Sequence, residues 1–357
     1  MDEERHHHAS ESPETGPNDR ESRAVGPGEA GLIYLGSSRG MERSLVPRTG
    51  VRSFLIPMAP PTSIKGMVLL GLAAIRSLLI LMRVRPRVTV ATGGYASTPA
   101  ALASWVLRIP VVLFLPDIFP GKAVAWLAPL SRRIAVTTEE TLGHFPPGKA
   151  VVTGYPLREW FAETSRDTGR RRFGLGEKDV ILLVFGGSQG ARHINEALAL
   201  WLPQLLTRLH VLHVCGEQRL PEAKTSAQNL PTELRTRYQL FPYLHDRDMA
   251  DALAAADIAL CRAGASVLGE LPATATPAIL VPLPQRTVHQ RENAQYLADR
   301  GAAVILEDGD LDAQLGPVLL RLLDEQGRLA TMTAAAQALA RPHATQAIVA
   351  LMDEVSV

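Results

Sequence analysis

The chain has 357 residues, of which 46% are hydrophobic and 20% are charged. This length fits two domains, and the composition is that of a chain that folds around a core. Lysine and arginine number 37 against 36 aspartates and glutamates, which gives a net charge of +1. So small a charge excludes the usual electrostatic basis for a nucleic-acid partner, and we expect none.

The charge is unevenly distributed along the chain. Residues 1–30 carry 3 basic and 8 acidic side chains (net −5), residues 31–150 carry 14 and 4 (net +10), and the remainder carries 20 and 24 (net −4). We therefore expect the first folded half to meet any anionic ligand or anionic surface.

Residues 1–30 combine glycine, proline and many charges with little apolar surface, which predicts a disordered tail. The three histidines at 6–8 are interpreted as incidental rather than as a metal-binding tract. This segment does not resemble a signal peptide. Cys215 and Cys261 stand too far apart for a disulfide framework or a metal cage, so we expect a reducing, cytoplasmic compartment.

Short apolar runs alternate with helical patterns through the first half of the chain. Residues 32–35 form an apolar run closed by a glycine, which is typical of a buried parallel strand. Further strands are predicted at 53–56, 88–91, 111–115 and 134–136, with helices at 64–82 and 97–107. The alternation predicts a doubly wound α/β sheet.

A second α/β series follows a linker at about residues 154–165. Its predicted strands are 180–185, 211–215, 258–261, 278–281 and 303–305, and its predicted helices are 191–206, 249–255, 266–271 and 290–300. We therefore predict a tail (1–30), a first domain (31–155) and a second domain (156–357), whose last helix can return to the first. The ligand is expected in a cleft between the two sheets, at the carboxyl ends of their strands.

Two glycine-rich turns stand directly after strands. Residues 186–190 (GGSQG) and 93–97 (GGYAS) occupy corresponding places in the two domains. Glycine lets the backbone approach a phosphate, and the first amides of the following helix supply a positive end. The lysine of a Walker loop is missing from 186–190, which argues against nucleoside triphosphate hydrolysis. Tight turns without a ligand are the alternative.

Two further polar groups stand at predicted helix starts. Glu270 lies one turn into its helix, where a carboxylate can accept hydrogen bonds from ribose hydroxyls, or can simply favour the helix dipole. His289, Gln290 and Asn293 open a later helix. Amides and imidazoles suit the recognition of sugar hydroxyls, and a polar N-cap is the alternative.

Residues 67–82 are apolar apart from Arg76 and Ser77, and basic residues flank them. A stretch of 16 residues is short for crossing a bilayer. It can instead lie against anionic lipid. A buried helix that covers the sheet is the favoured interpretation for most of its surface, and both hold if one edge protrudes.

Two acidic pairs match the D-x-D spacing of metal-dependent sugar transferases: Asp246 with Asp248, and Asp308 with Asp310. Because two acids with a gap occur often by chance, no metal site is predicted from them.

Six segments, in this order, resemble the MurG-type family of bacterial transferases, glycosyltransferase family 28. They are residues 35–42 (LGSSRGME), 93–99 (GGYASTP), 153–158 (TGYPLR), 186–195 (GGSQGARHIN), 257–270 and 282–293. The resemblance covers about residues 31–350. It implies a GT-B fold, with two Rossmann-like domains, the acceptor on the first and the UDP-sugar on the second.

The activity that this resemblance implies is inverting transfer of N-acetylglucosamine (GlcNAc) from UDP-GlcNAc to lipid I, the polyprenyl-diphosphate-linked MurNAc-pentapeptide. The product would be lipid II for peptidoglycan synthesis. The resemblance also implies a peripheral protein on the cytoplasmic face of the bacterial cell membrane, in contact with anionic lipid. It implies no cofactor and no bound metal.

The resemblance also assigns residues to two binding sites. The donor-binding residues that it implies are Arg158, Gly187, Ser188, Gln189, Tyr243, Leu244, Ala265, Ser266, Val267, Glu270 and Gln290. The acceptor-binding residues are Gly93, Gly94, Tyr95 and Ser97. Within the donor set, Arg158 and Ser188 are expected on the diphosphate, and Tyr243 with Leu244 beside the uracil. Glu270 is expected on the ribose and Gln290 on the sugar hydroxyls.

Two departures from the family pattern affect the acceptor side. Residues 1–30 contain no match to the first strand and GGTGGH loop of the family. Either the chain start is wrong or truncated, or this copy has lost them, and we expect the chain as given to transfer poorly or not at all. Where the family reads HEQN, residues 114–117 read FLPD, which makes Asp117 a candidate base or sugar contact. The alternatives are a related transferase with another lipid acceptor, such as diacylglycerol, and a non-catalytic UDP-sugar-binding protein.

Overall fold

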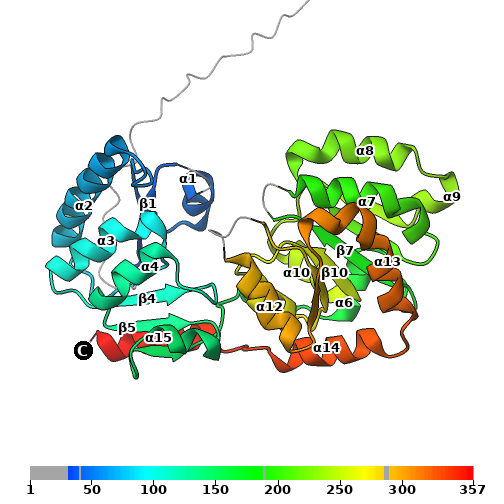
Figure 1. Cartoon of the computed structure of the whole chain (residues 1–357). Helices are drawn as coiled ribbons and strands as arrows, with labels where there is room; N and C mark the ends of the chain where they lie inside the picture. The colour runs from blue at the N-terminus through cyan, green and yellow to red at the C-terminus, as the bar shows by residue number, and fades with distance from the viewer. Residues whose placement is uncertain (1–30, 40–41, 188–189, 285–288, 357) are drawn as a thin grey trace, which may run out of the picture. The chain divides into compact units, whose positions relative to one another are not determined.

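The computed structural model describes residues 31–39, 42–187, 190–284 and 289–356. The tail predicted at 1–30 lies outside these residues. The chain forms two compact units, one up to Leu55 and one from Ile56 onward. Each unit is described by itself, with the labels of Figure 1.

The smaller unit contains a two-stranded sheet of β1 (Ile33–Ser37) and β2 (Arg52–Ile56). The short helix α1 (Glu42–Leu45) lies between these strands in the sequence. At the end of β1 the Ser37 amide donates to the Glu42 carboxylate at 2.8 Å. Both strands were predicted, within two residues at each end.

The larger unit begins with a four-stranded parallel sheet in the order β3-β4-β5-β6. Its strands are β3 (Thr89–Ala91), β4 (Val111–Leu115), β5 (Arg133–Val136) and β6 (Ala150–Val152). All five residues of β4 are buried, as expected for a strand covered on both faces. The strand β6 was not predicted.

Helices from both ends of the chain pack on this sheet. On one side are α3 (Gly94–Val106) and α4 (Lys122–Leu127), and α2 (Ile64–Val84) packs on α3. The C-terminal helix α15 (Ala344–Val355) packs on β4 and β5, where Ile348 and Leu351 contact Phe114 and Ala135. Figure 1 shows α15 in red beside β5. The chain therefore returns to its first large sheet at its end.

The second parallel sheet has the order β12-β11-β10-β7-β8-β9. Its strands are β7 (Ile181–Phe185), β8 (His210–Val214), β9 (Tyr238–Phe241), β10 (Ile258–Cys261), β11 (Ala278–Leu280) and β12 (Ala303–Ile305). The strand order reverses between β7 and β10. At such a switch point an open α/β sheet leaves a crevice at the carboxyl ends of its strands.

Helices cover both faces of this sheet. Alternate residues of β7 belong to two cores: Leu182 and Val184 join the helices α7 (Arg192–Leu205) and α13 (Leu311–Asp324). Ile181, Leu183 and Phe185 join the helices of the other face, which are α10 (Asp246–Ala255), α11 (Val267–Ala273), α12 (Gln290–Asp299) and α14 (Arg328–Ala338). The remaining α-helices are α5 (Trp160–Glu163), α6 (Arg166–Arg172), α8 (Leu220–Gln228) and α9 (Thr232–Arg235). The predicted doubly wound α/β pattern is confirmed.

The helix α2 differs from its prediction in length and in burial. It has 21 residues, and among the described residues it is the one helix long and apolar enough to cross a membrane, judged by length and composition. Only 17% of its most apolar window is buried. The preference for a largely buried helix was therefore wrong. The reason is that only Gly66, Ala73, Ser77 and Leu81 are buried, while several large apolar residues of α2 are exposed.

Candidate functional site

A cavity of about 340 Å³ lies at the carboxyl ends of β7 and β10, at the switch point of the second sheet. The residues that line it are Phe185, Gly186, Gly187, Gly190, Ala191, Arg192, Arg262, Gly264, Ser266, Val267, Leu283 and Gln290. Four of the predicted donor-binding residues are among them: Gly187, Ser266, Val267 and Gln290. We call this space the donor cavity.

The glycine-rich turn forms one wall of the donor cavity. Gly187 and Gly190 have φ angles of +80° and +73°, a region that glycine adopts without strain. A side chain on Gly186 would collide with the backbone amide of Ala191, and one on Gly190 with the carbonyl of Cys215. The turn therefore requires glycine, and it brings backbone against the cavity. Ser188 and Gln189, both predicted to bind the donor, lie outside the described residues.

Glu270 stands beside this cavity on α11. Its carboxylate accepts a hydrogen bond from the Ser266 hydroxyl at 3.0 Å, and Ser266 lines the cavity. Burial raises the pKa of the Glu270 carboxyl, and the Ser266 hydrogen bond and the Arg158 charge oppose this shift. A partly desolvated carboxylate of this kind is a strong acceptor for hydroxyl groups.

Gln290 and Arg262 complete the polar lining. The Gln290 side-chain oxygen accepts from the Leu283 amide at 3.1 Å, which fixes the orientation of its amide group. Arg262 follows directly after β10; its Nη1 donates to the Val281 carbonyl at 3.2 Å and lies 2.5 Å from Asp308. Sequence reasoning missed Arg262, although an arginine between a buried strand and a glycine turn was a usable signal.

The other predicted donor residues do not line the donor cavity. The Arg158 guanidinium is exposed, 3.4 Å from Asp246, and stacks over Trp160. Tyr243 is exposed and packs edge-on against His245, whereas the neighbouring Leu244 is buried. Ala265 lies in the turn that precedes α11, next to Ser266.

A second cavity, of about 760 Å³, adjoins the first and shares Leu283 and Gln290 with it. Phe119 and His289 line it, with their rings 5.1 Å apart. Close to these residues Asp117 accepts a hydrogen bond from the Asn293 amide at 2.9 Å. Burial raises the pKa of the Asp117 carboxyl, while the Asn293 hydrogen bond and His289 lower it.

Recognition of sugar hydroxyls, one of the two roles considered for Asn293, does not fit the structure. The Asn293 side chain is fully buried. Its oxygen accepts from the Ile118 amide at 3.1 Å, and its nitrogen donates to Asp117 and to the Ala263 carbonyl. Asn293 therefore holds the backbone and the carboxylate of the 117–118 segment, and has no amide hydrogen left for a sugar.

The residues predicted to bind the acceptor form the start of α3. Gly93 and Gly94 have φ angles of +76° and +73°. The Ser97 hydroxyl donates back to the Gly93 carbonyl at 2.6 Å. Tyr95 packs beside the small cluster that contains Met58. These contacts account for the turn, and the acceptor role of the four residues stays a prediction.

Three of the four acids in the two D-x-D pairs contact basic side chains. Asp246 faces Arg158, and Asp248 pairs with Arg172. Asp308 lies between Arg262 and His193, whose Nδ1 is 3.0 Å away. Hydrogen bonds from His193 and Arg262 lower the pKa of Asp308 against the opposing effect of burial. Within the described ranges, no group of three or more His, Cys, Asp or Glu residues is arranged to hold a metal ion.

Comparison with known proteins agrees with this geometry. The profile of the glycosyltransferase family 28 N-terminal domain matches residues 28–136, and that of the C-terminal domain matches residues 181–348. A curated UDP-N-acetylglucosamine--N-acetylmuramyl-(pentapeptide) pyrophosphoryl-undecaprenol N-acetylglucosamine transferase from Roseiflexus sp. (strain RS-1) is 37% identical over 90% of this chain and 83% of its own. A relative of the same name from Desulforudis audaxviator is 34% identical over 92% and 91%.

Solved structures give the same family and fold. The crystal structure of Acinetobacter baumannii MurG has a TM-score of 0.72 and 26% sequence identity, and covers 89% of each chain. A UDP-GlcNAc 2-epimerase from Neisseria meningitidis, bound to UDP-GlcNAc, has a TM-score of 0.63 at 14% identity over 88% of this chain and 89% of its own, and shares the fold. The predicted GT-B fold is thereby confirmed. By both of its domain profiles and by its curated relatives, the chain belongs to glycosyltransferase family 28.

Proposed function

We propose that this chain transfers GlcNAc from UDP-GlcNAc to the MurNAc-pentapeptide of lipid I and so makes lipid II for the bacterial cell wall. The curated relatives, which carry the name of this transferase, support the activity. The observation that carries it is the donor cavity. A glycine turn, Gln290 and the Glu270–Ser266 pair meet there at the switch point of the second sheet.

In this proposal the donor cavity binds the UDP-sugar. The diphosphate lies against the glycine turn and the first amides of α7, because unpaired amides at a helix start favour anions. Arg262 supplies a positive charge at the same wall. Glu270 accepts from the ribose hydroxyls, and Gln290 reads the GlcNAc hydroxyls.

The transfer is a direct displacement. The acceptor hydroxyl oxygen forms a bond to C1 of GlcNAc while the bond from C1 to the UDP oxygen breaks, so the anomeric configuration inverts. We assign the role of general base to Asp117, which takes the hydroxyl proton. Burial of its carboxyl supports this role because a raised pKa makes the carboxylate a stronger base. The departing UDP keeps the bond electrons, and the turn amides and Arg262 stabilise its charge.

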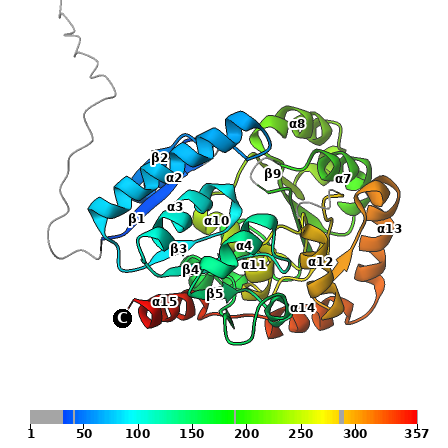
Figure 2. The ribbon, with the colours of Figure 1, turned by 60° about the vertical axis from the view of Figure 1, so that its left-hand side comes forward.

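The helix α2 provides the proposed contact with the membrane. Its outer face carries Met67, Leu72 and Leu79, which are each more than half exposed and recur at helical spacing. Figures 1 and 2 show α2 along the outside of α3, on which it packs. The segment 31–150 has a net charge of 14 − 4 = +10. Apolar insertion and attraction to anionic lipid together support peripheral binding at the cytoplasmic face.

The test of the proposed function is transfer of radiolabelled GlcNAc from UDP-GlcNAc to purified lipid I. We expect label in the lipid fraction, and β-configured product from the α-configured donor. Diacylglycerol is offered as a competing acceptor. Label only in diacylglycerol would overturn the acceptor assignment, and UDP binding without transfer to either lipid would leave a donor-binding protein.

A further inference from the structure

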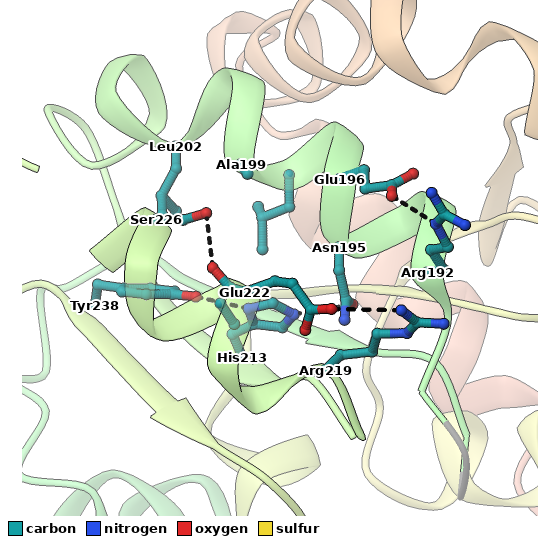
Figure 3. Close-up of a pocket in the computed structure, with 12 residues that line it drawn as sticks. Arg192, Asn195, Glu196, Ala199, Leu202, His213, Arg219, Glu222, Ser226 and Tyr238 are labelled. Atoms are coloured by element: carbon teal, nitrogen blue, oxygen red, sulfur yellow. Dashed lines mark hydrogen bonds and ion pairs between the residues drawn. The ribbon is translucent and has the colours of Figure 1, made fainter. Parts of the chain in front are cut away.

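Behind the glycine turn, the buried His213 and two half-buried side chains form a continuous line of hydrogen bonds. The Tyr238 hydroxyl lies 2.7 Å from Nδ1 of His213, and Nε2 of His213 lies 3.1 Å from the Asn195 side-chain oxygen. The Asn195 amide nitrogen donates to the Cys215 carbonyl at 2.8 Å. These residues come from β9, β8 and α7 (Figure 3). We call Tyr238, His213 and Asn195 the polar relay.

The last contact of the relay fixes its direction. Asn195 donates to Cys215 with its amide nitrogen, so its oxygen must accept from Nε2–H of His213. Burial lowers the pKa of His213 to about 3, so the imidazole is neutral and Nδ1 accepts from the Tyr238 hydroxyl. The three hydrogen bonds therefore run head to tail, an arrangement in which each bond strengthens the next.

The relay ends against the donor cavity. The Cys215 carbonyl packs on Gly190, closely enough that any side chain at position 190 would collide with it. Gly190 lines the donor cavity, and its amide donates to the Gly187 carbonyl at 3.0 Å, which closes the turn. Asn195 itself lies in the first turn of α7, where its backbone amide donates to the Ala191 carbonyl at 3.0 Å. One side chain thus joins the helix start to the strand end that supports the turn.

We propose that Asn195 is a positioning residue for the donor diphosphate: through the Cys215 carbonyl it holds the glycine turn and the first amides of α7 in their binding geometry, and His213 and Tyr238 orient it. The inference rests on the proposed placement of the diphosphate at this turn. Asn195 touches no donor atom in this role. Its loss should weaken contacts to the diphosphate and spare those to the nucleoside.

The relay forms the inner wall of a separate cavity of about 340 Å³ between α7 and α8. Ser226 of α8 lines the same cavity, but its hydroxyl donates to the Glu222 carbonyl within its own helix. Ser226 therefore offers a matched control: Ser226→Ala removes a hydroxyl from the cavity wall without touching the relay.

The critical variant is Asn195→Asp. The new carboxylate keeps the size of the side chain and the acceptor for His213, but has no hydrogen to donate to Cys215. The affinities of the full chain for UDP and for uridine are measured by ligand-observed NMR titration, and thermal unfolding checks the fold. We expect UDP affinity to fall roughly tenfold, because the turn amides lose the geometry that contacts the diphosphate, while uridine affinity stays unchanged.

Two further variants are compared with Asn195→Asp for their loss of UDP affinity. Tyr238→Phe removes only the outermost donor, so its loss of UDP affinity should be smaller than that of Asn195→Asp, and Ser226→Ala should change neither affinity. Equal losses of UDP and uridine affinity in Asn195→Asp would mean general destabilisation and overturn the positioning role, as would unchanged UDP affinity. If the parent chain bound uridine but gained nothing from the diphosphate, the donor-site proposal itself would fail, and this inference with it.

Discussion

The Asn293 side-chain nitrogen donates to the Asp117 carboxylate at 2.9 Å, although 176 residues separate the two in the sequence. Asn293 also accepts from the Ile118 amide, so it fixes both the backbone and the side chain of this segment. A half-buried carboxyl held in one orientation meets the geometric requirement for a base. The same burial raises the pKa of the Asp117 carboxyl, so we expect the activity to depend on pH.

The variant Asp117→Asn should show whether activity depends on proton uptake by Asp117 or only on the orientation of its segment. The new amide oxygen can still accept from Asn293, so the segment keeps its orientation, but the side chain can no longer take a proton. We expect kcat to fall by about 10²- to 10⁴-fold with little change in KM for UDP-GlcNAc. Steady-state kinetics with lipid I measures both constants. An unchanged kcat would remove Asp117 from the chemistry.

The pH dependence of the parent chain provides a second measurement on Asp117. The carboxyl must be ionised to act, so activity should fall as pH drops through a pKa above the ordinary aspartate value. The stability of the fold should change with pH in the opposite direction to the activity. A carboxyl with a raised folded-state pKa stabilises the fold when protonated, and this contribution is lost as pH rises through that pKa. Asp117→Asn should therefore unfold at a higher temperature than the parent at neutral pH.

The variant Glu270→Ala should weaken UDP binding. It removes the proposed ribose acceptor, a hydrogen bond to a charged group worth about 1.5 to 3 kcal/mol. Calorimetry with UDP measures the loss, and Glu233→Ala, on the exposed surface of α9, is the matched control. Equal UDP affinity for Glu270→Ala and the parent would exclude Glu270 from the ribose site.

Much of the donor cavity was predictable from sequence, because parallel strands end at one edge of a sheet. The turns after β7 and β10 were therefore expected at one edge of the sheet, and the pairing of these two strands brings Gly187 and Ser266 to the same cavity. The contact of Asn293 with Asp117 was not predictable. Helical spacing shows which residues share a face of a helix, but not which segment of the chain packs against that face. The strand β6 lies at the edge of its sheet and none of its three residues is buried, so it lacks the pattern of a buried strand.

The exposure of one face of α2 could not be predicted from the sequence for a related reason. The composition shows how many apolar residues α2 has, and only the packing of Gly66, Ala73, Ser77 and Leu81 shows which side faces inward. The basic flanks indicated lipid, but a burial preference based on hydrophobicity alone pointed the other way. An apolar helix on a soluble sheet and one on a membrane have similar composition.

The double substitution Leu72→Glu and Leu79→Glu should reduce membrane binding. The parent residues are 54% and 56% exposed on the outer face of α2, so neither supports the core. Each leucine buried in lipid contributes about 1.5 to 3 kcal/mol, so we expect at least a tenfold loss of partitioning. Co-sedimentation with anionic vesicles measures it.

Leu200→Glu is the control for this membrane prediction, because Leu200 is 64% exposed on α7, a helix of the second sheet. Binding of the parent should also weaken as salt screens the basic segment. Equal sedimentation of the control and the double variant would exclude α2 as the contact surface.

The carboxylate of Asp257 supports the strand that leads into the donor turn. It accepts from Arg170 at 2.9 Å, from Arg166 at 2.5 Å and from the amide of Ile181, the first residue of β7, at 2.8 Å. The Arg170 side chain is only 4% exposed, and its other hydrogen bonds go to backbone carbonyls. Asp257 is therefore the counter-charge of a buried guanidinium.

The variant Asp257→Ala should consequently destabilise the fold by about 3 to 5 kcal/mol, because removing one partner leaves a buried charge uncompensated. Urea unfolding measures the change, with Asp324→Ala as the control for an exposed pair, 2.7 Å from Arg208. The control should leave the midpoint nearly unchanged, since solvent screens exposed pairs. Asp257→Asn should lie between the two: its oxygen can still accept from Ile181, but the charge that balances Arg170 is gone. If Asp257→Ala unfolded at the same urea concentration as the control, the carboxylate would be dispensable, and the position of β7 would rest on its apolar contacts alone.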